Sequence, residues 1–211
     1  MKQLSLICTI HEERGHANSE ELYARLDRFK PEVIFLEAPS MDLNSFFREG
    51  ARKKLEVAPV WRYHNETGAA LIPVDLPTPE EKFFNDQREL TQRIEGNSRN
   101  FRRLSTWYGN YVCDYGFPYL NSDHNCKMQS EIYADMQSTV YEINSARMSE
   151  IYDLWRKTND LRDIEMLTNI QKYCSENTFE RGVFIVGAAH RRSIIEKSQT
   201  TTAIQWSFSD I

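Results

Sequence analysis

The stretch LSLICTIHE, residues 4–12, decides the fold class of this chain. Its first seven residues form an apolar run with the length and composition of a buried β-strand, and the run stops on His11-Glu12. The stretch VFIVGAAH, residues 183–190, repeats this pattern near the other end of the chain, where an apolar run leads to His190. Each stretch predicts a strand that is followed directly by a histidine near its carboxyl end.

Two more apolar runs stop on acidic residues. Residues 33–36 (VIFL) precede Glu37, and residues 70–74 (ALIPV) precede Asp75. Helical patterns separate the runs, so the chain opens as β-α-β-α-β, which favours a parallel sheet with helices on its faces. In such a sheet, ligands and chemistry gather beyond the carboxyl ends of the strands. The four strand ends therefore predict one polar site.

Apolar spacing and turn residues predict the other elements of the core. A capping-box pattern begins a helix over residues 19–29. Residues 41–67 are expected to be helical with a break near Pro59. Pro73 predicts that the third strand is an edge or irregular strand. Residues 201–208, rich in β-branched and aromatic side chains, predict a fifth strand.

Between the third and fourth strands the chain is helical in pattern. Residues 107–126 contain glycines and a proline interleaved with aromatic side chains, which predicts an aromatic loop. Such a loop is either a cover over a pocket or a turn whose aromatic side chains simply pack, and the sequence leaves both open. Two long helices are expected after it, over residues 127–157 and 161–177.

The expected fold class is α/β: a central mixed, largely parallel sheet of about five strands flanked by helices. Residues 1–211 are expected to form a single domain. Its α/β core comprises residues 1–77 and 181–211, and a helical insert over residues 78–180 covers the carboxyl ends of the strands.

Composition narrows the classes of protein and partner. The hydrophobic share of 40% and charged share of 27% are ordinary for a globular protein. A net charge of −5 and a pI near 5.6 give no support to a nucleic-acid partner or an anionic membrane surface. No apolar stretch approaches the roughly 20 residues that span a bilayer, and the first ten residues lack a signal-peptide pattern. The four cysteines are far apart without a CxxC pair, which predicts reduced thiols and a cytoplasmic protein.

His11 and His190 are the leading candidates for chemistry, because neutral imidazole either ligates a divalent metal or acts as a base near neutral pH. With Glu37 they make a ligand set of two histidines and one carboxylate, typical of a catalytic metal with an open position. Glu12 would then act as the base on a metal-bound water or support a ligand, and Asp75 would orient a histidine. The expected metal is Mn, Co or Zn. A metal-free histidine base would use the same residues.

Arg147 interrupts an apolar stripe in the helix expected over residues 127–157. A guanidinium in that position either snorkels to solvent or pairs with a buried anion. Pairing with Glu37, Asp75 or an anionic intermediate would place Arg147 in the active site, where it would stabilise developing negative charge.

The chain resembles the TraB/Tiki group, which is related to the erythromycin esterases and the ChaN-like haem-binding proteins. The resemblance rests on two GxxH-type motifs: GAAH at residues 187–190, and CTIH at residues 8–11, where cysteine replaces the usual glycine. Glu37 matches a glutamate that ends the second strand in the family. Arg147 matches an arginine on a helix before the last motif, and Asp75 lies where TraB-like chains often carry an acidic residue.

The resemblance implies several functions for one site. Tiki-like members imply a metal-dependent peptidase, erythromycin esterases imply hydrolysis by histidine-activated water, and ChaN-like members imply binding without catalysis. We therefore expect a metal-dependent hydrolase that cleaves a peptide, ester or related acyl bond in a small-molecule or peptide substrate. A non-catalytic ligand-binding or regulatory protein of the same fold stays open, including a degenerate member, which Cys8 would fit. A homo-oligomer is compatible with the sequence.

Overall fold

The computed structural model describes residues 2–40, 43–47, 54–198 and 204–209. In chain order the elements are β1 (Lys2–Thr9), α1 (Ser19–Phe29), β2 (Val33–Pro39), α2 (Leu43–Phe47), α3 (Val57–Thr67), β3 (Ala70–Asp75), α4 (Glu81–Asn97), α5 (Arg99–Leu120), α6 (Asp123–Ile143), α7 (Ala146–Glu176), β4 (Arg181–Gly187), the 3₁₀ turn η2 (Ala188–His190), α8 (Arg191–Ser198) and β5 (Ile204–Ser207). The strands form one five-stranded sheet in the order β3-β2-β4-β1-β5. The α/β class and the five strands are confirmed, and every strand pairing is parallel.

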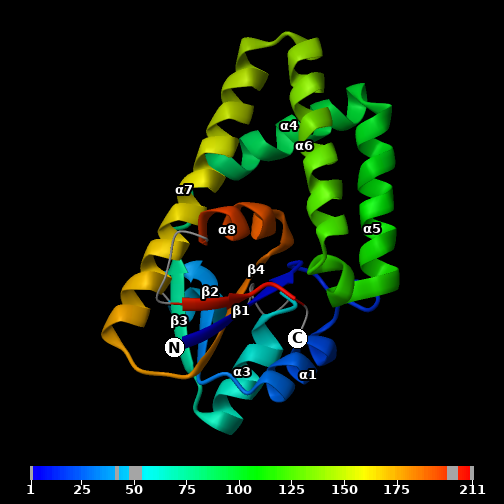
Figure 1. Ribbon diagram of the computed structural model, residues 1–211. Helices are drawn as coiled ribbons and strands as arrows, with labels where there is room; N and C mark the ends of the chain where they lie inside the picture. The colour runs from blue at the N-terminus through cyan, green and yellow to red at the C-terminus, as the bar shows by residue number, and fades with distance from the viewer. Residues whose placement is uncertain (1, 41–42, 48–53, 199–203, 210–211) are drawn as a thin grey trace.

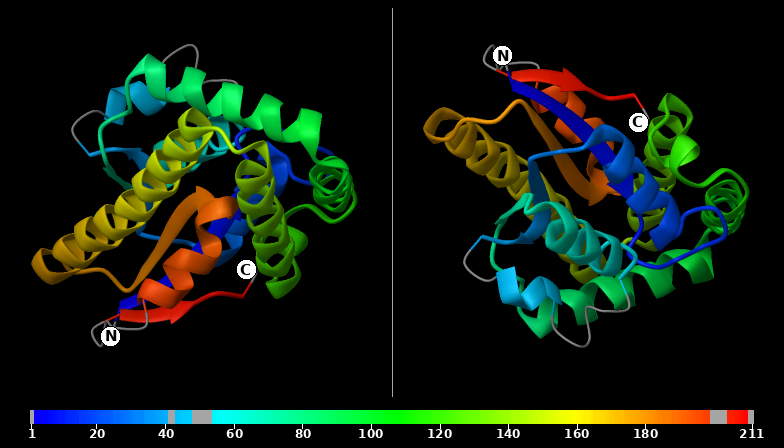
Figure 2. Two further views of the ribbon diagram at one scale, coloured as in Figure 1. Left: turned by 90° about the horizontal axis from the view of Figure 1, so that it is seen from above. Right: turned by 90° about the horizontal axis from the view of Figure 1, so that it is seen from below.

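Helices cover both faces of the sheet. α1 and α3 pack together on one face, and α7 and α8 lie on the other (Figures 1 and 2). β1 and β4 are neighbours inside the sheet, and both are buried over nearly their whole length. Strands covered on both faces are continuous apolar runs rather than alternating ones. This explains why residues 4–10 and 183–186 could be recognised as strands from the sequence.

The segment between β3 and β4 builds a helical insert from α4 to α7. Figure 1 shows α6 and α7 rising away from the sheet and meeting at the far end of the insert. The insert has its own cluster of buried apolar side chains, drawn from α4, α5, α6 and α7, beside the larger cluster around the sheet. None of the helices in the described residues is long and apolar enough to cross a membrane.

The predicted start and end of the first helix and the predicted edge position of the third strand are confirmed. α1 spans the predicted residues 19–29, and its N-cap, Asn18, accepts a hydrogen bond from the backbone N–H of Glu21 at 3.0 Å. Lys30 ends the helix in the left-handed region, with φ of 54°. Pro73 lies in β3, which is an edge strand as expected.

The aromatic loop predicted over residues 107–126 is wrong, because helices α5 and α6 occupy most of this segment. α5 accommodates its glycines and proline by a kink at Gly116, where φ is 53°. A Cβ at Gly116 would lie 2.5 Å from the carbonyl carbon and oxygen of His16, so only glycine fits this contact with the loop after β1. Gly116 therefore marks a close approach between two segments.

The boundaries predicted for the last long helices are also wrong. α6 ends at Ile143, and α7 runs without a break through residues 158–160, where a gap between helices was expected. Asn144 adopts the left-handed conformation that ends α6, with φ of 52°, and Ser145 is the N-cap of α7. The Asn-Ser pair was the local signal for this break, since asparagine tolerates the left-handed region and serine favours N-caps.

The helix predicted over residues 41–67 and the predicted fifth strand differ in part from the structure. The expected helix over residues 41–67 is divided into α2 and α3, and residues 41–42 and 48–53 lie outside the described residues. Pro59 does not break a helix, because it lies in the first turn of α3, where backbone N–H groups have no intrahelical partner. Of the strand predicted over residues 201–208, β5 spans Ile204–Ser207 and Phe208 lies beyond its end, while residues 201–203 lie outside the described part.

Asn121, between α5 and α6, joins the insert to the sheet. Its side-chain oxygen accepts a hydrogen bond from the backbone N–H of Cys8 at 2.8 Å, and its amide nitrogen donates to the Cys8 carbonyl at 3.2 Å. β5 pairs with β1 only as far as Ser5, so the Asn121 amide supplies backbone partners beyond the end of β5.

Asn121→Ala is expected to lower the free energy of unfolding by about 2–3 kcal/mol, because each buried polar group left unpaired costs about 1–3 kcal/mol. Urea unfolding measures the change. Asn97→Ala is the control, since Asn97 is exposed and its amide donates to the Arg93 carbonyl within α4. Equal losses in the two variants would contradict the role assigned to Asn121.

Candidate active site

The four strand-end residues predicted from the sequence lie at the carboxyl end of the sheet, on neighbouring strands. Asp75 ends β3, Glu37 lies near the end of β2, His190 closes the 3₁₀ turn after β4, and His11 follows β1. Since the sheet order is β3-β2-β4-β1, the side chains follow one another across the sheet in the same order. The parallel topology thus brings together residues that are far apart in the sequence.

Glu37 lies at the centre of this group. Its Oε1 accepts a hydrogen bond from Nη2 of Arg162 at 2.6 Å, and its Oε2 accepts one from the backbone N–H of Gly187 at 2.6 Å. Its side chain is 9% exposed. Burial alone would raise the pKa of Glu37, but the charges of His190, Arg162 and His11 and the Gly187 N–H lower that pKa to about 2. Glu37 is therefore a fixed buried anion.

His190 is held on both sides by carboxylates. Its Nδ1 lies 2.5 Å from Oδ1 of Asp163, and its Nε2 lies 3.6 Å from Oε1 of Glu37. Asp163 projects from α7, and both side chains are almost fully buried. The imidazole therefore presents Nε2 to the centre of the site while Asp163 fixes the other ring nitrogen.

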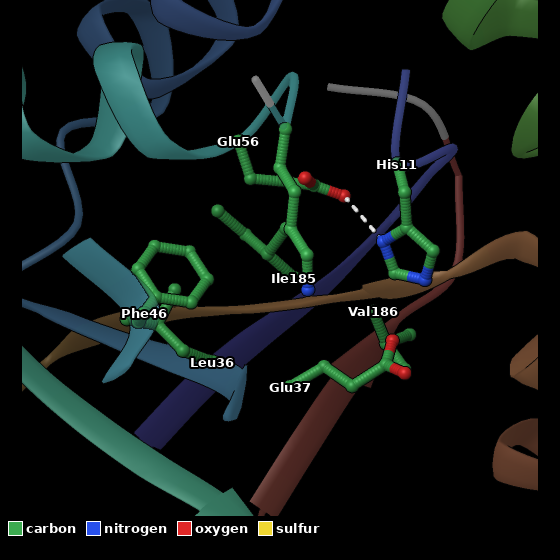
Figure 3. A pocket seen from close by; sticks show the side chains of 8 residues that line it. His11, Leu36, Glu37, Phe46, Glu56, Ile185 and Val186 are labelled. Atoms are coloured by element: carbon green, nitrogen blue, oxygen red, sulfur yellow. Dashed lines mark ion pairs between the residues drawn. The ribbon is translucent and has the colours of Figure 1, made fainter. Parts of the chain in front are cut away.

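His11 is arranged in a similar way but is more open. Its Nδ1 lies 3.6 Å from Oε1 of Glu56, and its side chain is 54% exposed (Figure 3). A Cβ placed on Gly187 would lie 3.8 Å from Nε2 of His11, 3.7 Å from Cδ2 of His190 and 3.2 Å from Oε2 of Glu37. Three site residues thus approach one glycine, and any side chain at Gly187 would crowd the space between them.

The pKa values of both histidines are raised above the usual 6.5. For His11 the facing carboxylate of Glu56 is the main cause, with the charge of Glu37 adding to it. For His190 burial opposes the charged form, but the carboxylates of Glu37 and Asp163 outweigh burial. The site therefore favours imidazolium over neutral imidazole relative to a histidine in water.

The raised pKa of His190 should make the folding stability depend on pH. A pKa that is higher in the folded state stabilises the protein below the unfolded value of 6.5, and this contribution is lost as pH rises through the folded pKa. We expect the melting temperature of the wild type to fall, relative to that of His190→Gln, as the pH is raised from 6.5. Melting curves of both proteins across this range test the prediction. A difference that grows in favour of the wild type at high pH would contradict it.

Arg162, which was not among the predicted site residues, occupies the position predicted for Arg147. Nε of Arg162 donates to Asp75 at 3.1–3.2 Å, and Nη2 donates to Asp75 at 2.5 Å and to Glu37 at 2.6 Å. Arg147 instead lies at the exposed start of α7 and pairs with Glu89 and Asp86 of α4. The Arg147 side chain is 57% exposed and reaches toward solvent, as in the snorkelling alternative, although one partner, Asp86, is a buried carboxylate and neither partner is Glu37 or Asp75.

Glu12 does not join the group. It is exposed in the loop after β1. Glu56, just before α3, takes the position beside His11 and also accepts a short hydrogen bond from the hydroxyl of Thr9. Glu56 falls inside the helix expected over residues 41–67, and no strand end or apolar stripe marked it as a site residue.

The sequence carries a signal for Asp163. This residue shares a buried helix face with Met166 and Ile170, at spacings of three and seven residues. A carboxylate on an apolar stripe requires a buried partner, by the same reasoning that singled out Arg147.

The donor set does not fit a metal ion in this arrangement. Oε1 of Glu37, the oxygen beside His190, already accepts from the Arg162 guanidinium, and Oε2 accepts from the Gly187 N–H. A metal ligated by Glu37 would lie against the permanent positive charge of Arg162. Among the described residues, no group of three or more His, Cys, Asp or Glu side chains is arranged to hold a metal ion.

A small pocket opens beside His11. It has a volume of about 10 Å³, which leaves room for about one water molecule. Figure 3 shows the Glu56 and Glu37 carboxylates on opposite sides of it and His11 between them. The remaining wall is largely apolar, and its residues are Leu36, Phe46, Lys54, Ile185 and Val186.

Neither a protein-family model nor a curated protein sequence matches the chain. A solved structure of a mutant of the erythromycin esterase EreC in its open conformation is similar, with 13% sequence identity and a TM-score of 0.37. The match covers 88% of this chain, which spans 60% of the length of that esterase. A likeness this distant carries no conclusion about the site or its chemistry.

Proposed function

We propose that this protein is a hydrolase in which His11 activates a water molecule for attack on an acyl carbon. The observation that carries the proposal is the arrangement of the two imidazoles around Glu37. Nε2 of His190 faces Glu37 while its Nδ1 is held by Asp163, and His11 approaches the same point while its Nδ1 faces Glu56. Two histidines that are oriented by carboxylates and share one anion form an acid–base pair.

Their unequal exposure supports different roles. His11 is half exposed and therefore accessible to water and substrate, whereas His190 is buried. In the proposed reaction the neutral His11 takes a proton from water as the water oxygen bonds to the acyl carbon. The bond to the leaving group then breaks, and the proton passes from His11 to that group. His190, held as the cation by Asp163, and Arg162 stabilise the negative charge that develops on the acyl oxygen.

The proposed reaction uses no metal, because both oxygens of Glu37 already accept hydrogen bonds and the Arg162 guanidinium lies against one of them. The metal-dependent route, with His11, Glu37 and His190 as ligands of Mn, Co or Zn, stays a prediction from the sequence. Elemental analysis and assays after chelation separate the two routes. The proposal expects activity to survive chelation. Near-stoichiometric metal that is lost in both His11→Ala and His190→Ala would overturn the metal-free route.

The test of function is a panel of chromogenic acyl substrates that includes p-nitrophenyl esters and amino-acid p-nitroanilides. Hydrolysis by the wild type that disappears in His11→Gln supports the proposal. If no member is cleaved by the wild type at any pH between 6 and 9, where a histidine base titrates, the hydrolase proposal fails. The chain would then be a ligand-binding protein of the same fold, as the ChaN-like relatives of the TraB/Tiki group imply. Membership of that group itself stays a prediction from the motif residues.

A further inference from the structure

The chain is held to the helical insert on both sides of His11. Three residues before His11, the backbone N–H and carbonyl of Cys8 both bond to the amide of Asn121, the C-cap of α5. Three residues after His11, Arg14 begins a turn that ends at Ala17 and lies against α5 (Figures 1 and 2). His11 therefore lies between two segments that α5 and its C-cap hold.

The Arg14–Ala17 turn is closed by its own hydrogen bonds. The N–H of Arg14 donates to the carbonyl of Ala17 at 2.8 Å, and the N–H of Ala17 donates to the carbonyl of Arg14 at 2.9 Å. Gly15 supplies the positive φ of 54° inside the turn, and Ala17 is fully buried. Because both bonds are made, a displacement of the turn is passed on to the residues just before it.

One side of α5 receives this turn. Gly109 and Cys113 are four residues apart and share one face of α5, and Gly116 follows three residues later at the kink. The carbonyl of Cys113 accepts a hydrogen bond from the N–H of His16 at 3.0 Å. A Cβ at Gly15 would lie 2.3 Å from the same carbonyl oxygen. The turn is therefore in direct backbone contact with α5.

The two glycines of α5 leave the space that the turn fills. A Cβ at Gly116 would lie 2.5 Å from the carbonyl oxygen of His16, and a Cβ at Gly109 would lie 2.5 Å from Nη1 of Arg14. Both distances are far shorter than van der Waals contact. Gly116 meets backbone atoms of the turn, whereas Gly109 meets the end of a flexible side chain. A side chain at Gly116 would therefore push the turn itself.

His11 makes few contacts that would resist such a push. Its side chain is 54% exposed. Within the described residues its hydrogen-bond and ion-pair partners are the Leu55 N–H, which donates to the His11 carbonyl at 3.1 Å, and Glu56, which lies 3.6 Å from its Nδ1. The position of the imidazole therefore depends on the segments on either side of it.

We propose that α5 is a positioning element for His11, in which Gly109, Cys113 and Gly116 hold the Arg14–Ala17 turn and, through it, the His11 imidazole. The inference rests on the proposed function where it makes His11 the base whose position matters. The helical insert then contributes to the reaction through the placement of the base, besides its own packing.

The kinetic test is Gly116→Ala, with Gly68→Ala as the control. Gly68 also has a positive φ, of 77°, but nothing else in the described structure lies within 4 Å of a Cβ added there. A shift of about 1 Å in a reacting group costs about 10²-fold in rate. Per folded molecule, as measured by circular dichroism, kcat should fall about tenfold or more in Gly116→Ala and change less than about twofold in Gly68→Ala. Equal kcat values in the two variants would overturn the proposal.

Gly109→Leu keeps the proposal testable if Gly116→Ala does not fold, because Gly109 has helical backbone geometry and leucine is a good helix former. The new side chain should displace Arg14 and press on the turn, which lowers kcat, and Arg14→Ala in the same protein should restore kcat by making room. Gly96→Leu in α4 is the control, since a Cβ there meets no other described atom within 4 Å. Wild-type kcat in Gly109→Leu, or a loss that Arg14→Ala does not relieve, would contradict the proposal.

A measurement without substrate separates this proposal from the hydrolase. At one fixed pH, the ¹⁵N ring signals of His11 should shift in Gly116→Ala and Gly109→Leu, with His64 in α3 as the internal control. Shifted His11 signals in a protein that cleaves no acyl substrate would support the positioning and overturn the hydrolase. Unshifted His11 signals together with hydrolysis would overturn the positioning and leave the hydrolase intact.

Discussion

Arg162→Met is expected to lower the free energy of unfolding by about 3–5 kcal/mol, the range found when one partner of a buried ion pair is removed. The side chain of Arg162 is 22% exposed, and those of Glu37 and Asp75 are 9% and 6% exposed. Without the guanidinium, two buried carboxylates would face each other with only the histidines to offset them. For a chain of this length the loss corresponds to a melting temperature lower by about 10 °C or more.

The same helix offers a matched control for this prediction. Arg147→Met removes an arginine whose side chain is 57% exposed; its partner Glu89 is exposed, and its buried partner Asp86 keeps the ion pair with Lys82, so the loss should be small. Calorimetry should therefore show a large fall for Arg162→Met and almost none for Arg147→Met. Asp75→Asn in the Arg162→Met protein should recover part of the loss, because it removes one of the unpaired charges. Similar melting temperatures for the two arginine variants would show that Arg162 does not hold the site together.

His11→Gln is expected to reduce kcat by about 10²–10⁴-fold, which is the usual contribution of a general base. The fold should persist, because the His11 side chain is half exposed and its substitution leaves no large cavity. His16→Gln is the control, since His16 is an exposed histidine in the same loop. Steady-state kinetics on any substrate found in the panel, with circular dichroism of each variant, make the comparison. Retention of most of the activity in His11→Gln would remove His11 from the mechanism.

The pH dependence of the rate gives a second readout for His11. The base must be neutral, and Glu56 raises the pKa of His11 above 6.5. The rate should therefore rise with pH through a midpoint above that value, and Glu56→Gln should move the midpoint to lower pH. A midpoint that stays fixed in Glu56→Gln would contradict the pairing of these residues.

The strand ends were predictable from the sequence because buried parallel strands are continuous apolar runs, and each of them stops on a polar residue. Position after a strand was enough to bring His11, Glu37, Asp75 and His190 together, since the carboxyl ends of parallel strands share one edge. No spacing rule specifies which helical residues reach that edge. Arg147 and Arg162 lie on one helix, and only the packing of α7 against β3 decides which of them meets the carboxylates.

Glu56 and residues 107–126 show two other limits of prediction from the sequence. Glu56 reaches His11 from the segment before α3, so tertiary packing alone gives it a role. The segment over residues 107–126 contains the glycines and proline typical of loops, yet it is mostly helical. Gly116 provides the kink in α5 and the close approach to His16. A glycine in the sequence does not show whether it lies in a kinked helix or in a turn.

The shared site of His11, Glu37 and His190 is the central claim, and histidine titration by ¹⁵N NMR in the wild type and in Glu37→Gln tests it most directly. The charge of Glu37 raises the pKa of both histidines, so its removal should lower both values together. His16, His64 and His124 lie outside this group and serve as the internal controls. A pKa that falls for only one of His11 and His190, or for neither, would show that the two histidines do not share Glu37 and would contradict the account.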